Sequence, residues 1–253
     1  MKPAFAFLPA LVTLLSLGAL IVHGPIAQPA NYHAFADPDH LLGIPNASDV
    51  LSNLGFAIVG LWGIVKLWPQ RHHPRLQPAR PGYALFLVGL TLTALGSGYY
   101  HLAPDNARLI WDRLPIALAC AGLLAGVWSE TALPRKHVPT ATALLALYSL
   151  ASVFWWSFTE QQGHGDLRPY LLLQILPIML IPLWQTIYRS ATADRLAFAA
   201  ALLLYVFAKL AEIYDLALYN TTDMLISGHT LKHLLATAAA AVLVGRLIKR
   251  TRA

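Results

Sequence analysis

Residues 96–115 read Gly-Ser-Gly-Tyr-Tyr-His-Leu-Ala-Pro-Asp-Asn-Ala-Arg-Leu-Ile-Trp-Asp-Arg-Leu-Pro, and no other segment between two apolar runs concentrates so many chemically capable side chains. Ser97 and His101 are four residues apart, so they share one face if this part is helical. Pro104 then breaks the chain into a short turn before Asp112 opens the next apolar run. The stretch therefore predicts two helices joined by a polar turn, with Ser97, His101 and Asp112 close together.

A second histidine motif lies near the C-terminus, in the segment Ser-Gly-His-Thr-Leu-Lys-His at residues 227–233. It places His229 and His233 four residues apart, the spacing at which two imidazoles on one helix can bind the same metal ion. With His101 and Asp112, the chain offers three histidines and a carboxylate at the ends of apolar runs. Three histidine ligands leave a fourth zinc position for water, which is the open arrangement of a catalytic zinc site.

The composition excludes a soluble globule. Of 253 residues, 57% are hydrophobic and only 12% are charged, which is too little polar surface for a soluble domain of this size. Several apolar runs are long enough for a transmembrane helix, which needs about 20 residues. The sequence therefore predicts an all-α integral membrane helix bundle, a seven-helix core plus one additional N-terminal span. The runs are 4–22, 49–68, 82–101, 110–128, 138–157, 168–188, 194–215 and 229–248.

The net charge of +6 could indicate an acidic partner such as nucleic acid, but the positions of the basic loop residues argue against one. One side of the predicted membrane has only Arg108, Arg113 and Arg168 in its loops. The positive-inside rule therefore makes both termini cytoplasmic and puts the histidine ends of the helices near the outer face. The basic residues on the cytoplasmic side are Lys2, Lys66, Arg71, Arg75, Arg80, Arg135, Lys136, Arg189, Arg195, Arg246, Lys249, Arg250 and Arg252.

Residues 1–30 allow two interpretations. A single basic residue precedes the first apolar run, and Ala27-Gln-Pro-Ala30 resembles a loose cleavage region, so the segment could be a signal peptide. The run is longer than a usual signal-peptide core, and retaining it gives the even number of spans that the charges require. We therefore expect an uncleaved N-terminal transmembrane helix, or signal anchor, in residues 1–30 and a single seven-helix domain in residues 31–253.

Three charged residues recur every third position in the seventh apolar run, at Lys209, Glu212 and Asp215. Charged groups inside a span normally face the bundle and pair with one another. We expect a structural ion pair between Lys209 and Glu212, with Asp215 near the outer end and free to serve the site.

The segment before the second run is rich in oxygen ligands. Asp37, Asp39, Asn46 and Asp49 could bind calcium, or they could form an ordinary solvated acidic loop. Ser48 or Asp49 is placed as the N-cap of the following helix.

Taken together, the Ser97-x3-His101 pair, Asp112 eleven residues beyond it and the His229-x3-His233 pair in the last span resemble the alkaline ceramidase family. This family belongs to a wider group of seven-helix membrane hydrolases that includes the adiponectin receptors. The resemblance extends in order over roughly residues 37–245, and short loops make the chain similar to a bacterial member. It departs from the family in its additional N-terminal span, and Asn46 and Asp49 match only loosely the family's acidic calcium-binding segment.

The resemblance implies a zinc ion bound by His101, His229 and His233. It also implies that Asp112 handles the proton of the attacking water and that Ser97 helps to stabilise the oxyanion. The expected activity is zinc-dependent hydrolysis of a membrane lipid amide, ceramide or a related N-acyl lipid, to a free fatty acid and an amine.

Two other classes of protein use similar residues. A zinc-binding membrane receptor or structural protein would have the same ligands without turnover, and the presence of both Asp112 and Ser97 argues against it. A bis-histidine haem electron carrier would place its ligands across the membrane interior, whereas the three histidines here are expected at one face beside a carboxylate.

Overall fold

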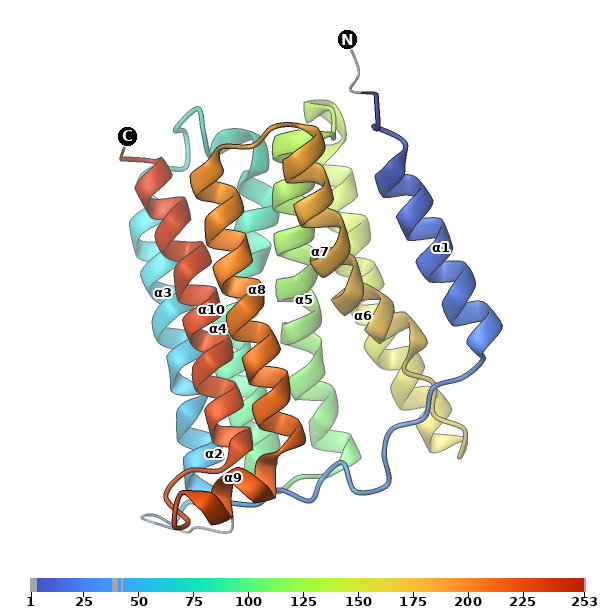
Figure 1. Cartoon of the computed structure of the whole chain (residues 1–253), viewed down its shortest axis with the longest axis vertical. Coiled ribbons are helices and arrows are strands. Elements are labelled where there is room, and N and C mark those ends of the chain that lie inside the picture. Colours follow the sequence, from blue (N-terminus) through green and yellow to red (C-terminus); the bar gives the residue numbers. More distant parts are fainter. Residues whose placement is uncertain (1–3, 38–40, 42, 253) are drawn as a thin grey trace.

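The computed structural model describes residues 4–37, 41 and 43–252. Its secondary structure is helical apart from one isolated bridge between Leu41 and Ile44 (Figure 1). Lys2 and Asp39 lie outside the described residues. The α-helices are α1 (Leu8–His23), α2 (Ala47–Ser52), α3 (Leu54–Leu67), α4 (Arg80–Leu102), α5 (Asn106–Thr131), α6 (Val138–Gln161), α7 (Arg168–Ile187), α8 (Thr192–Ile213), α9 (Asp215–Thr221) and α10 (Gly228–Arg250), with short 3-10 helices η1 (Gln77–Ala79) and η2 (Arg135–His137).

Seven segments of the described chain are long and apolar enough to cross a membrane. They are Ala47–Leu67, Gln77–Leu102, Asn106–Thr131, Arg135–Gln161, Arg168–Ile187, Thr192–Ile213 and Gly228–Arg250. The predicted all-α bundle with a seven-helix core is thus confirmed. The N-terminal helix α1 is apolar but has 16 residues, fewer than the about 20 that usually span a bilayer.

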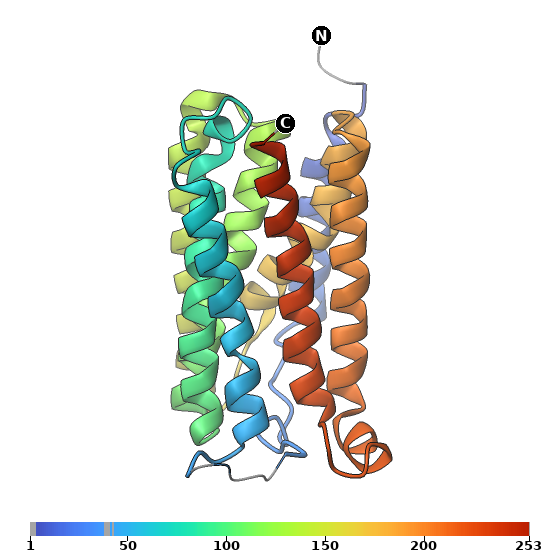
Figure 2. The same cartoon turned by 90° about the vertical axis from the view of Figure 1, so that its left-hand side faces the viewer.

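Both chain ends lie at one end of the bundle (Figures 1 and 2). Helix α1 runs beside α7 toward the opposite end, and the linker after it crosses beneath the other helices before α2 begins (Figure 1). Because successive spans alternate in direction, the end of α4 and the starts of α2, α5 and α10 all lie at that opposite end. The chain order therefore brings the two histidine motifs to the same end of the bundle.

Helices α4 and α5 pack very closely because small residues face each other across the contact. A Cβ atom at Gly82 would meet the backbone of Gly126, and one at Gly89 would meet the backbone of Ala119. In membranes, such small-residue contacts let two backbones approach. This close pair fixes the position of the polar turn between α4 and α5.

Helix α5 begins earlier than the apolar pattern predicted, at Asn106 rather than near residue 110. Asp105 is its N-cap and accepts a hydrogen bond from the Arg108 N–H at 2.7 Å, which stabilises the first turn. Pro115 is therefore inside the helix and not in its first turn, where a helix start near residue 110 would place it. The polar N-cap, not the start of the apolar run, sets the beginning of the helix.

The predicted N-cap of α2, Ser48 or Asp49, was also wrong. Asn46, with φ of 47°, precedes α2, while Ser48 and Asp49 are within it. The Asp49 side chain is fully buried, and its Oδ1 atom accepts hydrogen bonds from Thr230 in α10 and from Ser227, the N-cap of that helix.

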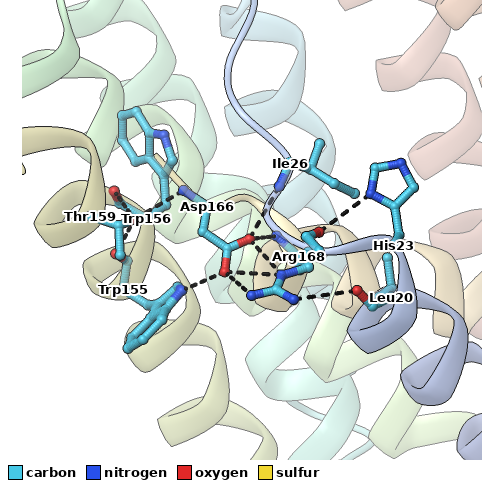
Figure 3. Close-up of polar contacts among 9 residues, drawn as sticks. Leu20, His23, Ile26, Trp155, Trp156, Thr159, Asp166 and Arg168 are labelled. Atoms are coloured by element: carbon cyan, nitrogen blue, oxygen red, sulfur yellow. Dashed lines mark hydrogen bonds and ion pairs between the residues drawn. The ribbon is translucent and has the colours of Figure 1, made fainter. Parts of the chain in front are cut away.

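Asp166, between α6 and α7, and Arg168, the first residue of α7, form a buried ion pair (Figure 3). Asp166 is 3% exposed and accepts hydrogen bonds from Arg168 Nη2 at 2.8 Å, Trp155 Nε1 at 3.1 Å and the Ile26 N–H at 3.4 Å. Arg168 Nη1 in turn donates to the carbonyl of Leu20 in α1 at 3.4 Å. The pair thus joins α6 and α7 to α1 and its linker.

These contacts keep the Asp166 carboxyl ionised. Burial alone would raise the pKa of its carboxyl, but the hydrogen bonds from Arg168, Trp155 and Ile26 favour the ionised form and lower its pKa to about 2.

Candidate metal centre

Three buried histidines meet at the end of the bundle opposite the chain termini. His101 is in the last turn of α4, and His229 and His233 are on successive turns at the start of α10. One ring nitrogen from each lies within 4.8 Å of the others, and the Nε2 atoms of His101 and His229 are 3.2 Å apart. The two motifs that are far apart in sequence therefore form one cluster that could hold a metal ion.

Helix α2 orients one of these rings. Ser52 Oγ lies 2.8 Å from His233 Nδ1, and Asn53 Nδ2 lies 3.4 Å from the same nitrogen. This contact leaves His233 Nε2 available as a ligand atom. Hydrogen bonds to the second ring nitrogen commonly fix the tautomer and orientation of a metal-binding histidine. The sequence alone does not reveal this contact, because about 180 residues separate Ser52 and Asn53 from His233.

The start of α10 is held by groups from three parts of the chain. Ser227 is its N-cap and accepts from the Thr230 N–H at 2.9 Å, while the Asp215 Oδ1 atom accepts from the His229 N–H at 2.8 Å. The other oxygen of Asp215 accepts from the Ala36 N–H at 2.9 Å. The sequence predicted that Asp215 would be free to serve the site. Instead, both of its oxygens accept backbone hydrogen bonds, and Asp215 connects His229 to the linker.

The residues considered for calcium also support the histidines. Asp49 Oδ1 accepts from Thr230 Oγ1 at 2.6 Å, and Asn46 Nδ2 donates to the His101 carbonyl at 2.8 Å. Asp37 Oδ2 accepts from the Asp49 N–H at 3.2 Å. These contacts connect the ends of α2, α4 and α10, and calcium binding remains a prediction.

The linker between α1 and α2 covers the cluster with an aromatic ring. The centroid of the Phe35 ring lies 4.8 Å from that of His101 and 4.2 Å from that of His229. His33 lies beside it and makes a 2.8 Å contact between its Nδ1 and the Tyr100 hydroxyl. Sequence analysis missed Phe35 because a single phenylalanine in a loop carries no periodic signal.

The predicted ion pair between Lys209 and Glu212 is present, and a second lysine joins it. Lys232 Nζ lies 3.0 Å from Glu212 Oε1 and 2.9 Å from His229 Nε2. A metal ion would use the same lone pair of His229 that faces Lys232 here, and Glu212 would remain as the partner of the ammonium group. The histidine donor set is therefore compatible with a metal ion.

Ser97 and Asp112, the two other predicted site residues, lie together on the wall of a cavity that also reaches His233. Their side chains interact with each other across the contact between α4 and α5. The cavity has a volume of about 390 Å³ and continues into the bundle. Its deeper walls are apolar and include Phe86, Leu90, Phe198, Leu202 and Leu243.

In comparisons with known proteins, the sequence matches no protein-family model and no curated protein. The described structure is that of a seven-span membrane protein in which His101, His229 and His233 form a buried cluster able to hold a metal ion.

Proposed function

We propose that this protein is a zinc-dependent membrane hydrolase that cleaves a lipid amide, ceramide or a related N-acyl lipid, to a fatty acid and an amine. The observation that carries the proposal is the arrangement of polar groups at the head of an apolar cavity. Ser97 and Asp112 line the cavity together with His233, one of the three clustered histidines, and a lipid with its acyl chain in the cavity would present its amide to these groups.

Zinc is the metal that best suits this donor set. Three neutral imidazoles with an open fourth position are typical of catalytic zinc sites, whereas calcium and magnesium prefer oxygen ligands. A zinc ion bound by His101, His229 and His233 would supply a water of lowered pKa and polarise the amide carbonyl.

The protein's own residues would perform the proton transfers. Asp112 would accept the proton of the attacking water and deliver it to the leaving amine as the C–N bond breaks. Ser97 would donate a hydrogen bond to the carbonyl oxygen as negative charge develops on it. The apolar side chains deeper in the cavity would hold the acyl chain and exclude bulk water from the reacting group.

The resemblance to alkaline ceramidases supports the same roles, and we assign them to the seven-helix domain in residues 31–253. The direct test is to purify the full-length protein in lipid nanodiscs, determine its metal content by mass spectrometry and measure fatty-acid release from a panel of lipid amides. We expect about one zinc per chain and release of fatty acid. A fully zinc-loaded protein that released no fatty acid from any lipid amide would favour a zinc-binding receptor or structural protein instead.

We further propose that both termini are cytoplasmic and that the site lies near the outer face of the membrane. The basic loop residues at the end that carries the termini support this orientation. A reporter enzyme that works only in the cytoplasm, fused after Ala253, should be active. Activity only of an externally functioning reporter at that position would reverse the orientation.

A further inference from the structure

A buried arginine lines the same cavity as Ser97 and Asp112. Arg113 is 2% exposed, and it follows Asp112 directly in α5. In the part of the chain that the structure describes, no carboxylate lies within ion-pair distance of its guanidinium. A buried charge without a counter-ion is costly, so other groups must compensate for the burial of this guanidinium.

Aromatic rings and one amide hold the guanidinium in place. Its Cζ atom lies 3.9 Å from the centroid of the Trp156 ring and 5.0 Å from that of Tyr32. Its Nη2 atom donates to Gln28 Oε1 at 2.8 Å. The faces of the rings attract the cation and offset part of the cost of burying it.

Two donor atoms of this guanidinium remain unused. Arg113 Nε and Nη1 are buried and have no hydrogen-bond partner among the described residues. Most buried polar groups in proteins are paired, and an unpaired charged donor costs more than a neutral one. Since Arg113 lines the cavity, a bound molecule can supply the missing acceptors.

The other charges around the cavity favour a negatively charged acceptor. Lys209 and Lys232 both pair with Glu212, while Asp112 interacts with Ser97. The cavity walls thus carry three cationic side chains and two carboxylates, an excess of one positive charge when all are ionised. In surroundings of low dielectric constant, such an excess attracts an anion strongly.

We propose that Arg113 is a substrate-binding residue for an oxyanion, a carboxylate or a phosphate, on the non-acyl part of the lipid. This rests on the proposed function and narrows its substrate class to acidic N-acyl lipids, in preference to neutral ceramide. The acyl chain occupies the apolar part of the cavity, and the oxyanion accepts hydrogen bonds from the guanidinium.

The test uses the full-length protein in nanodiscs and single-chain probes that contain no amide. Dodecyloxyacetate and dodecyl phosphate are the anionic probes, and dodecyl 2-methoxyethyl ether and the dimethyl ester of dodecyl phosphate are their neutral counterparts. Affinities are measured for wild type, Arg113→Gln and Arg108→Gln, a matched control that removes a partly exposed arginine of the same helix. Metal content and melting temperature verify that each variant is folded.

We expect wild type to bind at least one anionic probe about tenfold more tightly than its neutral counterpart, as a charge-assisted hydrogen bond allows. Arg113→Gln should abolish this preference and leave binding of the neutral probes unchanged, whereas Arg108→Gln should retain it. Preference for the carboxylate probe would identify an N-acyl amino acid type of substrate, and preference for the phosphate probe a phosphorylated head group.

Equal affinity of wild type for charged and neutral probes would overturn the assignment of Arg113, and so would an unchanged preference in folded Arg113→Gln. If Arg113→Gln does not fold, equal affinity of wild type for charged and neutral probes still overturns the assignment. No probe contains an amide, so the binding measurements do not depend on whether the protein hydrolyses lipid amides. Conversely, a hydrolase without the preference would refute only the role of Arg113.

Discussion

Two buried polar clusters lie at the same end of this bundle, and they differ in how completely their atoms are paired. At the cluster around Asp166, both carboxylate oxygens accept hydrogen bonds, from Arg168, Trp155 and Ile26 (Figure 3). Around the histidines, His101 Nδ1, Asp49 Oδ2 and Asn53 Oδ1 are buried without a partner among the described residues.

This difference in hydrogen bonding indicates a structural role for the Asp166 cluster and a ligand-binding role for the histidine cluster. A cluster whose members satisfy one another needs no further molecule and stabilises the contact between its helices. A cluster that keeps unpaired atoms beside a cavity gives up stability, which is typical of sites that bind a ligand. Substitutions should therefore affect binding and turnover at the histidine cluster, and stability at Asp166.

The largest effect is expected from His233→Ala. Two remaining imidazoles bind zinc weakly, so metal content should fall from about one per chain to near zero, and turnover should disappear with it. Metal analysis after dialysis against a weak chelator measures the loss. Full zinc retention in this variant would remove His233 from the set of ligands.

Asp112→Asn should keep its zinc and lose turnover by about 10²–10⁴, the usual contribution of a positioned general base. The amide keeps the size of the carboxylate but cannot accept the proton. Ser97→Ala should lose about 10²–10³, the cost of one oxyanion donor. The exposed carboxylate of Asp223 provides a matched control, and Asp223→Asn should be as active as wild type. Wild-type rates in zinc-loaded Asp112→Asn would refute its role as a base.

A smaller effect is expected from Ser52→Ala, which removes the contact with His233 Nδ1. Loss of such a supporting contact typically weakens metal affinity about 10–100-fold. Competition with a zinc chelator measures the change, and Asp166→Asn should show none. Equal zinc affinity in Ser52→Ala and wild type would mean that the ring of His233 is held by other contacts.

The smallest effect, confined to stability, is expected from Asp166→Asn. The folded-state pKa of about 2 lies below the ordinary 3.8, so the ionised carboxylate stabilises the fold above about pH 4, and this contribution is lost as the pH falls through 2. The shift corresponds to about 2 kcal/mol. Unfolding in detergent, followed by circular dichroism from pH 7 to pH 2, should show wild type approaching the variant only in acid. A constant difference at all pH values would contradict this.

Residue types and their spacing determined much of the candidate site. The interval of four residues places Ser97 near His101 and His229 near His233 on any helix, and the alternation of spans brings both pairs to one end. Hydropathy was sufficient to predict the seven core helices because a bilayer admits few other structures. Helix starts were less predictable, since Asp105 caps α5 before its apolar run begins and α2 starts at Ala47, ahead of the second apolar run.

Only the tertiary structure decided what the isolated polar residues do. Phe35, Ser52 and Asp215 contact the histidines from other parts of the chain, and Arg113 faces the cavity because α5 packs against α4 through glycines. Such contacts depend on how helices are rotated and spaced relative to one another. Periodicity along one helix gives no information about its neighbours. The sequence by itself therefore determined which polar groups are available to the site. Packing between helices determined which of those groups are left without a hydrogen-bond partner.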